Sequence, residues 1–447
     1  MNDVRRLHKC QENYLALVEL CDDEQWETAQ AAMRNFDKSC PDWPDSENLR
    51  NLITTHLHRQ ALVKIADEAR RRADWGSIRR VSHDLSEIDP GDPLAFSLLR
   101  EAQLADEEDE RNRRDRIGHA RIHATAGNFQ RCLELLKSNF VNSPVDILTA
   151  KALVELVDNL NIPLIWRLRA AKILGTTKDP RLPITSTEWQ NELEQTNNKF
   201  GEPQSYWSFV RAGKYLIGGW QFGQSSAAVP LSAFWIGRYP ITNEQFKYFV
   251  DTRSRKLDWR VWQKSYYSKS KGFEQLKSSP SNEPVHLASW HDATLFAGWL
   301  NLQIQGILHE DYIIRLPTEA EWEAAAAFDA SGKRRSFPWG DELPSIDRVA
   351  YKESQLSGPN PVGIYPNQAA CGAYDMAGNV WECTTSLSEK YPAGSHLSCY
   401  QFTDNDAISW RGGDTDSNDD QLLCSYRSEW CMFENMSGGF RLVIAKK

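Results

Sequence analysis

The sequence of 447 residues lacks the features that are typical of membrane proteins, secreted proteins and nucleic-acid-binding proteins. It has no apolar run of about 18 residues, so it predicts no membrane-spanning helix. Its first residues contain no apolar stretch of about 7–15 residues, so we expect no secretory signal. Its formal net charge of -9 gives no excess of positive charge. These absences favour a protein that binds neither membranes nor nucleic acids.

Cysteine pairs with metal-binding or redox spacing are also missing. The chain has nine cysteines, an odd number, and no two of them form a C-x-x-C pair. Zinc ribbons and thioredoxin-like sites need that spacing and are therefore excluded. With no signal segment in sight, the pattern predicts reduced thiols and a cytoplasmic location.

The tryptophans are the first sign that the chain has two unlike halves. Of 17 tryptophans, 12 lie after residue 200. A chain of this length, with 41% hydrophobic and 25% charged residues, predicts two to four domains with buried cores. We expect a multidomain protein of α and α+β class. Its parts are a helical repeat domain over residues 1–175, a linker over 176–205 and a mixed domain over 206–447.

The first half carries apolar residues at three- and four-residue spacing, which predicts helices throughout. An aromatic residue followed 15 positions later by a proline recurs three times, at Trp26, Trp75 and Phe129. This recurrence resembles tetratricopeptide-like helical repeats, and an extra helix per repeat would account for its longer spacing of 49 and 54 residues. Such a domain implies a protein or peptide partner. A plain helical bundle is the alternative.

The composition changes after the first half. Residues 176–205 are polar and contain three prolines, which predicts a linker with one short helix around Trp189. After residue 205, strands, glycine turns and short helices alternate. Two helices are predicted to start at capping boxes, Thr242–Gln245 and Thr318–Glu321, and a third at the near variant Ser289–Asp292.

Nine segments of the second half occur in the order found in one known family. They are FVRAGKYLIGG, AFWIGRYPITNEQFKYFV, EPVHLASWHDATLFAGWLN, RLPTEAEWEAAA, FPWGDE, NPVGIYPN, GAYDMAGNVWE, RGG and GGFRLV. Together they resemble the formylglycine-generating enzyme domain, also called the sulfatase-modifying factor domain, over residues 206–447. The resemblance implies a mixed α+β fold related to C-type lectins. It also implies a family that contains oxygenases as well as non-catalytic binding modules.

The resemblance implies two copper-binding cysteines after the pair Gly412 and Gly413, but neither is present. The matching positions are Ser417 and Leu422. Copper(I) in these sites needs two soft thiolates, so we expect no copper and a pseudoenzyme without oxygenase activity. The alternative is a metal-dependent oxygenase of the same family with a relocated site. Cys424, Cys431 and the histidines would be its candidates.

The resemblance also implies a calcium site in the segment YDMAGNVWE. Carried over by position, its ligands are the side chains of Asp375 and Glu382 and the backbone carbonyls of Gly378 and Val380. An all-oxygen ligand set suits calcium. The alternative is a turn held by hydrogen bonds alone.

The segment between RGG and GGFRLV implies a ligand-facing surface over residues 414–437, as in binding members of the family. Its polar residues can make adaptable contacts and its aromatic residues offer large apolar area. The predicted contact residues are Thr415, Asp416, Ser417, Asn418, Gln421, Tyr426, Trp430, Phe433 and Asn435. The alternative places Trp430 and Phe433 in the core.

The two halves together predict a recognition or adaptor protein. We expect a protein or peptide ligand at residues 414–437 and a second partner at the helical repeats. By analogy with bacterial proteins of this build, we expect a role in a defence or signalling system. The sequence does not indicate an oligomeric state.

Overall fold

The computed structural model describes residues 2–45, 48–140, 146–219, 226–252, 276–387, 407–431 and 438–447. It divides the chain into two compact units, Met1–Asp115 and Arg116–Lys447. The division falls inside one helix, α5 (Pro93–Thr125). None of the described helices combines the length and the apolar character needed to cross a membrane.

The N-terminal unit is helical. Besides the start of α5, its helices are α1 (Asn2–Asp22), α2 (Trp26–Ser39), α3 (Leu49–Arg72) and α4 (Trp75–Ile88). Helices α2 and α4 begin at the recurring aromatic residues, as the sequence predicts. Asp74 caps α4, because its carboxylate accepts a hydrogen bond from the backbone N–H of Ser77 at 3.0 Å. The long spacing of the recurrence comes from long helices rather than from an extra helix, since α3 has 24 residues and α5 has 33.

A disulfide joins Cys10 of α1 to Cys40, the residue that follows α2. For these two cysteines, the disulfide corrects our expectation that the thiols are reduced. The two cysteines are 30 positions apart, and the packing of α1 against α2 brings their Cα atoms within 5.9 Å. No sequence spacing reveals such a pair. The free and buried cysteines of the described residues are Cys21, Cys132, Cys371, Cys383 and Cys424.

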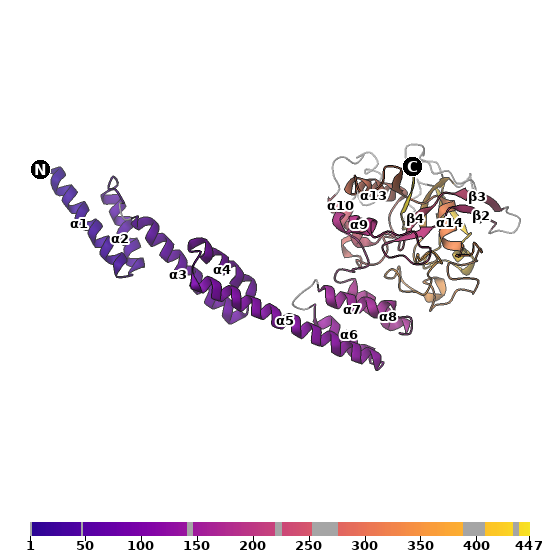
Figure 1. The fold of residues 1–447 in the computed structure, drawn as a ribbon, viewed down its shortest axis with the longest axis horizontal. Coiled ribbons are helices and arrows are strands. Elements are labelled where there is room, and N and C mark those ends of the chain that lie inside the picture. Colours follow the sequence, from indigo (N-terminus) through magenta and orange to yellow (C-terminus); the bar gives the residue numbers. More distant parts are fainter. Residues whose placement is uncertain are drawn as a thin grey trace. The chain divides into compact units, whose positions relative to one another are not determined.

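The C-terminal unit opens with helices and continues as a mixed α+β domain. In chain order its elements are α6 (Phe129–Ser138), α7 (Ile147–Asp158), α8 (Leu164–Leu174), α9 (Ser186–Glu194), β1 (Trp207–Val210), β2 (Gly213–Gly218), β3 (Ser226–Leu231), β4 (Phe234–Gly237), α10 (Asn243–Thr252), α13 (Trp290–Gln303), β5 (Tyr312–Arg315), α14 (Glu319–Ala327), β6 (Glu382–Leu387), β7 (Ala407–Arg411), β8 (Arg427–Cys431) and β9 (Val443–Lys446). In Figure 1, α10 and α13 lie on one side of this unit and α14 lies beside β2 on the other.

Three antiparallel sheets organise these strands. The largest has the order β1-β4-β9-β5, so the last strand of the chain lies between β4 and β5. Strands β2 and β3 form a hairpin, and β6, β7 and β8 form a third sheet. In that third sheet Arg411 pairs with Glu382 on one side and with Arg427 on the other. The sheet therefore places the end of the YDMAGNVWE segment beside the RGG segment.

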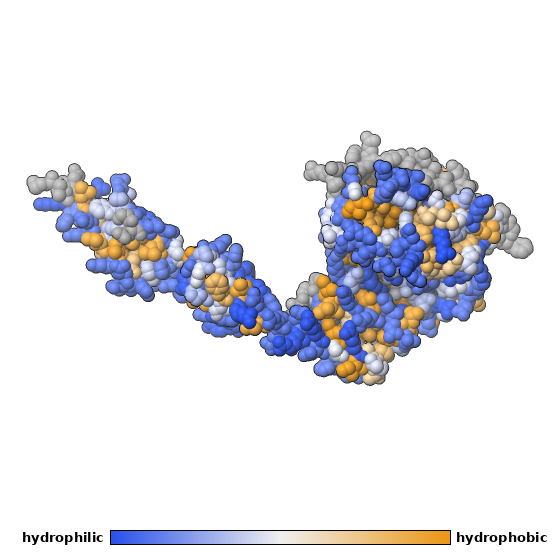
Figure 2. Space-filling view, in the orientation of Figure 1, coloured by the Kyte–Doolittle hydropathy of each residue, from blue (hydrophilic) through white to orange (hydrophobic). Residues whose placement is uncertain are grey.

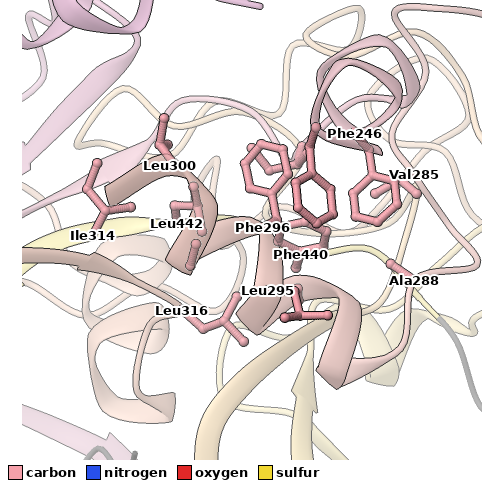
Figure 3. Packing of buried hydrophobic residues seen from close by; sticks show 14 of the residues in the cluster. Phe246, Val285, Ala288, Leu295, Phe296, Leu300, Ile314, Leu316, Phe440 and Leu442 are labelled. Atoms are coloured by element: carbon pink, nitrogen blue, oxygen red, sulfur yellow. The ribbon is translucent and has the colours of Figure 1, made fainter. Parts of the chain in front are cut away.

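Aromatic side chains fill the main core of this unit. Phe440 packs against Phe246 and Phe296, with ring centroids 6.2 Å and 5.6 Å apart. Figure 3 shows the three rings together with Val285 and Leu442. Buried aromatic pairs of this kind add to the stabilisation that comes from their buried area. The core ties α10 and α13 to the last strand, which fixes the elements around the site described below.

Residues 116–205 differ from the predicted domain boundaries. Helices α6–α8 belong to the C-terminal unit, because Ala171 and Leu174 pack in one cluster with Ile364 and Tyr365. The predicted linker contains α9, and Trp189 on that helix is buried in the main core. The short helix around Trp189 is thus confirmed, but the segment is packed rather than a flexible spacer. The polar composition of residues 176–205 did not indicate this packing, because a few buried side chains such as Trp189 are enough to anchor a mostly polar segment.

Candidate functional site

The RGG segment ends β7 and turns in a way that requires glycine. Gly412 and Gly413 have φ angles of +95° and +76°, in the left-handed region that side chains rarely adopt. A Cβ atom at Gly412 would lie 3.2 Å from the ring of Trp322. The carbonyl of Gly412 accepts a hydrogen bond from the N–H of Gly378, at 2.8 Å. This contact joins the RGG turn to the YDMAGNVWE segment.

Buried charged groups hold β7 in place ahead of this turn. Arg411 is fully buried and pairs with two carboxylates of α14, Glu323 at 2.5 Å and Glu319 at 3.2 Å. Arg427 on β8 also pairs with Glu319, at 3.0 Å. Buried charges are tolerated when they are paired and hydrogen-bonded. The end of β7, which leads into residues 414–418, is therefore anchored to α14 and to β8.

The loop that follows, residues 414–418, folds around one carboxylate. Asp414 accepts hydrogen bonds from the hydroxyl of Ser417 at 2.8 Å and from the N–H of Asp416 at 3.0 Å. The hydroxyl of Ser417 accepts in turn from the N–H of Asp414 at 2.9 Å. Such local side-chain bonds stabilise turns. They leave Asp416 and Asn418 exposed while Thr415 and Ser417 are buried.

An open cavity of about 570 Å³ lies beside this loop. Its lining comes from residues 286–287, 356–359, 379–381 and 414–416 and from Gly438. Gly438 is required there, because a Cβ atom would lie 2.6 Å from the ring of Trp410. The volume is within the range of small-ligand and side-chain pockets. Since its walls belong to five separate segments, only the tertiary structure assembles it.

The cavity is acidic. Two aspartates, Asp414 and Asp416, contribute carboxylates, and no lysine or arginine is among its described lining residues. Burial lowers the pKa of His286, so its imidazole is neutral at neutral pH and does not offset those charges. Trp381 and Leu287 add apolar surface. The arrangement suits a group that combines positive charge with an apolar stem.

The predicted contact residues divide into three groups. Thr415 and Asp416 line the cavity. Ser417, Asn418, Gln421 and Tyr426 do not, although Asn418 accepts a hydrogen bond from the ammonium group of Lys352 at 3.0 Å. Phe433, Asn435 and the side chain of Trp430 lie outside the described residues. Ligand contacts at these positions stay a prediction.

The sequence reasoning missed the rest of the cavity wall. His286 and Leu287 precede α13, and residues 356–359 belong to a loop far from them in the chain. The one sequence signal for this wall is His286 in the motif EPVHLASW, where a polar ring interrupts an apolar stretch. Nothing in the sequence places it beside Asp414.

The predicted calcium ligands are engaged within the protein. Both oxygens of Glu382 accept hydrogen bonds from Arg441 at 2.6 Å, and one also accepts from the indole N–H of Trp322. The oxygens of Asp375 accept from the N–H of Gly363 at 2.7 Å and from the amide of Asn367 at 3.0 Å. A guanidinium so close to the site repels a cation. The side chains of Asp375 and Glu382 are thus engaged by donors of the protein itself, and a calcium ion held by them and by the carbonyls of Gly378 and Val380 stays a prediction.

The positions implied for copper-binding cysteines are both interior. Leu422 is fully buried and Ser417 nearly so. Cys424, one candidate for a relocated site, is unfavourable too, because burial raises the pKa of its thiol and disfavours the thiolate that binds metal. Among the described residues, no three histidine, cysteine or acidic side chains form a metal-binding group. Cys431 has no described side chain.

Comparison with known proteins places these segments in a family. A family model described as the sulfatase-modifying factor enzyme 1-like domain matches residues 181–446. Hercynine oxygenase of Mycobacterium tuberculosis is 39% identical over 183 residues, which are 37% of this chain and 40% of that protein. Inactive C-alpha-formylglycine-generating enzyme 2 of Mus musculus is 27% identical over 211 residues, which are 38% of this chain and 62% of that protein.

A solved structure, that of PvdO from Pseudomonas aeruginosa, covers 56% of this chain and 100% of its own. It is 19% identical, with a TM-score of 0.41. The chain spans about two fifths of the length of the hercynine oxygenases that it matches.

Proposed function

Because the chain belongs to the sulfatase-modifying factor enzyme 1-like domain family over residues 181–446, we propose that this domain serves here as a non-catalytic binding module. Its ligand is a protein or peptide that inserts a positively charged side chain into the cavity at residues 414–416. The observation that carries the proposal is the contrast between two neighbouring features. The positions implied for catalytic cysteines hold a buried serine and a buried leucine, whereas the cavity beside them is open and acidic.

The lining of the cavity supports this ligand class. A lysine or arginine side chain has an apolar stem that can lie against Trp381 and Leu287, and a charged end that the carboxylates of Asp414 and Asp416 attract. The loop is also shaped before any ligand arrives, since Asp414 and Ser417 hold it through mutual hydrogen bonds. Pre-organisation of this kind reduces the entropy lost on binding.

A peptide-display selection on the full-length protein tests the proposal. We expect enrichment of peptides with lysine or arginine, and binding that weakens as salt concentration rises. Asp416→Asn removes one exposed carboxylate from the cavity and should weaken the selected peptides about 5- to 10-fold, as measured by fluorescence polarisation. Asp419→Asn is the matched control, because Asp419 is exposed in the same segment but outside the cavity lining.

Equal affinity of Asp416→Asn and Asp419→Asn for the selected peptides would contradict the proposal. So would a selection that enriches no basic residues. Thermal melts of both variants establish that each is folded before affinities are compared.

A second candidate function is an oxygenase with a relocated metal site. The 39% identity to the Mycobacterium tuberculosis hercynine oxygenase favours it. The test is dioxygen consumption by the full-length protein with hercynine as probe substrate, after reconstitution with iron(II) or with copper(I). Turnover that is lost in Cys424→Ser would establish this candidate and displace the binding module. Consumption no faster than that of the metal alone would remove it.

Three parts of the sequence-based hypothesis stay predictions. They are a second partner at the N-terminal helices, a cytoplasmic location and a role in a bacterial defence or signalling system. The exposed apolar side chains of Leu15 and Phe96 are compatible with a partner at those helices. Affinity capture with Phe96→Ala beside the wild type would test it, and identical partner lists would remove it.

A further inference from the structure

A second cavity of about 460 Å³ in the C-terminal unit has no lining residue in the 414–418 loop. Its walls are the end of α8, the first turns of α10 and the segment 276–283. None of its lining residues belongs to the cavity at residues 414–416. A ligand here would therefore be distinct from the one proposed above.

Hydrogen bonds between the three walls make this cavity a formed feature. The buried amide of Asn282 donates to the carbonyl of Ala171 at 2.9 Å, and the hydroxyl of Ser281 donates to the carbonyl of Gly175 at 2.6 Å. The N–H of Glu244 donates to the carbonyl of Ser281 at 3.0 Å. Gly175 allows the close approach, since a Cβ atom there would lie 2.3 Å from Oδ1 of Asn282. The segment 276–283 is thus bonded to both α8 and α10.

Lysines reach the cavity from all three walls. Lys172 comes from α8, Lys247 from α10 and Lys277 from the segment 276–283. In the described part of the chain, neither Lys172 nor Lys247 makes an ion pair within 4.0 Å. A lysine ammonium is a compact charge that commonly binds phosphate groups. Three of them around one hollow favour a ligand group that carries more than one negative charge.

Two carboxyl groups, Glu244 and Glu283, share the cavity with the lysines. Burial raises the pKa of Glu283 to about 7, although Lys172 opposes the shift. Burial also raises the pKa of Glu244, which faces Lys247 on its own helix and Lys178 and Asp179 from the segment after α8. Each protonated carboxyl removes a negative charge and adds an O–H donor that an anion can accept. The balance of charge in the cavity therefore becomes more positive as the pH falls.

We propose that the cavity formed by α8, α10 and the segment 276–283 binds a small molecule that bears a phosphate or sulfate group, and that the group lies among Lys172, Lys247 and Lys277. Glu283 controls this binding, because its ionised form repels the anion and its protonated form does not.

Isothermal titration of the full-length protein with sulfate tests this site. Sulfate keeps the same charge between pH 6 and pH 8, so any change in affinity reports on the protein. With a Glu283 pKa of about 7, the carboxyl is mostly protonated at pH 6 and mostly ionised at pH 8. We expect the wild type to bind sulfate about 5- to 10-fold more tightly at pH 6.

Two variants and two controls separate the proposal from general charge effects. Glu283→Gln should bind more tightly than the wild type at pH 8, and should lose most of the pH dependence, because only Glu244 remains to titrate in the cavity. Lys247→Gln should weaken binding about 10-fold at both pH values. Glu310→Gln and Lys333→Gln change exposed charges elsewhere in the unit and should bind like the wild type. Acetate at equal ionic strength should bind more weakly than sulfate.

Absence of saturable sulfate binding at pH 6 would overturn the site. Sulfate binding that Lys247→Gln leaves unchanged would place the anion elsewhere. A pH dependence as large in Glu283→Gln as in the wild type would remove the role of that carboxyl. Acetate bound as tightly as sulfate would overturn the ligand class. Each variant is compared only after a melting curve shows that it is folded.

Discussion

Arg441 is a fully buried cation whose hydrogen bonds reach two separate segments of the C-terminal unit, the end of β4 and the YDMAGNVWE segment. Its guanidinium forms two hydrogen bonds of 2.6 Å with Glu382 and donates to the carbonyls of Gly237 at 3.0 Å and Tyr374 at 2.9 Å. A charge buried this deeply is stable only when it is paired and its donors are satisfied. The same pairing occupies the carboxylate that the sequence suggested for calcium. At the scale of single residues, the role of Glu382 is thus set by its ion pair with Arg441.

Removing that cation should cost far more than removing a surface cation. Arg441→Met leaves Glu382 buried without a counter-charge, and we expect a loss of about 3–5 kcal/mol in the free energy of unfolding. Arg348→Met is the control, because Arg348 pairs with an exposed Glu342 and should change stability by about 0.5 kcal/mol or less. Urea unfolding measures both. Similar losses in the two variants would contradict the buried pairing.

At the scale of elements, helix starts follow local rules and turns follow local sterics. Helices α13 and α14 begin at complete capping boxes, Ser289 with Asp292 and Thr318 with Glu321. Both starts were predicted from the sequence, since the two partners are three positions apart. At Thr242 the structure has half of the box: Gln245 accepts from the N–H of Thr242 at 2.9 Å. The stability of the turns between these elements depends, in addition, on the atoms that pack against each turn.

Two glycines with similar backbone angles distinguish the effect of the backbone conformation from the effect of the atoms packed against the turn. Gly378 and Gly332 have φ angles of +71° and +81°. A Cβ atom at Gly378 would lie 2.2 Å from the carbonyl oxygen of Ala350, whereas one at Gly332 meets nothing within 4 Å. We expect Gly332→Ala to lose about 1 kcal/mol from the backbone angle alone. Gly378→Ala should lose about 3 kcal/mol or more, because the turn must also move.

Chemical denaturation of both glycine variants checks this prediction. Equal losses would mean that the YDMAGNVWE turn relaxes freely and does not hold the RGG turn in place. The larger loss at Gly378 should be accompanied by weaker peptide binding at residues 414–416, since Gly378 donates to Gly412.

At the scale of the whole molecule, the compact units do not follow the change in composition. The helical pattern ends near residue 175, but the second unit begins at Arg116. The reason is the apolar face of α8, where Ala170, Ala171 and Leu174 are fully buried. Figure 2 shows a different hydrophobic patch over α7, where Ile147 and Leu148 are exposed. Burial of one helix face, rather than helix content, decides which unit a helix belongs to.

Hydrogen exchange measured by mass spectrometry tests this assignment. Leu174→Ala should destabilise the C-terminal unit by about 2–5 kcal/mol and increase exchange in residues 350–365, which share its cluster. Leu85→Ala in α4 removes an equally buried leucine from the N-terminal unit and should leave exchange there unchanged. If Leu174→Ala instead affected only α1–α4, the predicted boundary at residue 175 would stand.

The sequence alone determined the features of this protein that depend on near neighbours. Helices that begin at Trp26 and Trp75, the short helix around Trp189 and the capping boxes are set by residues a few positions apart. The ordered motifs likewise sufficed to identify the family and its mixed α+β fold. They also revealed Ser417 and Leu422 at the positions implied for the copper-binding cysteines.

Only the tertiary structure decided the features that join distant segments. These are the Cys10–Cys40 disulfide, the pairing of Glu382 with Arg441, the boundary at Arg116 and both cavities. In each case the partners are about 30 to 200 positions apart or come from several loops. The packing of helices and sheets brings these partners together. A local sequence pattern does not indicate which distant side chain will pack against a given residue.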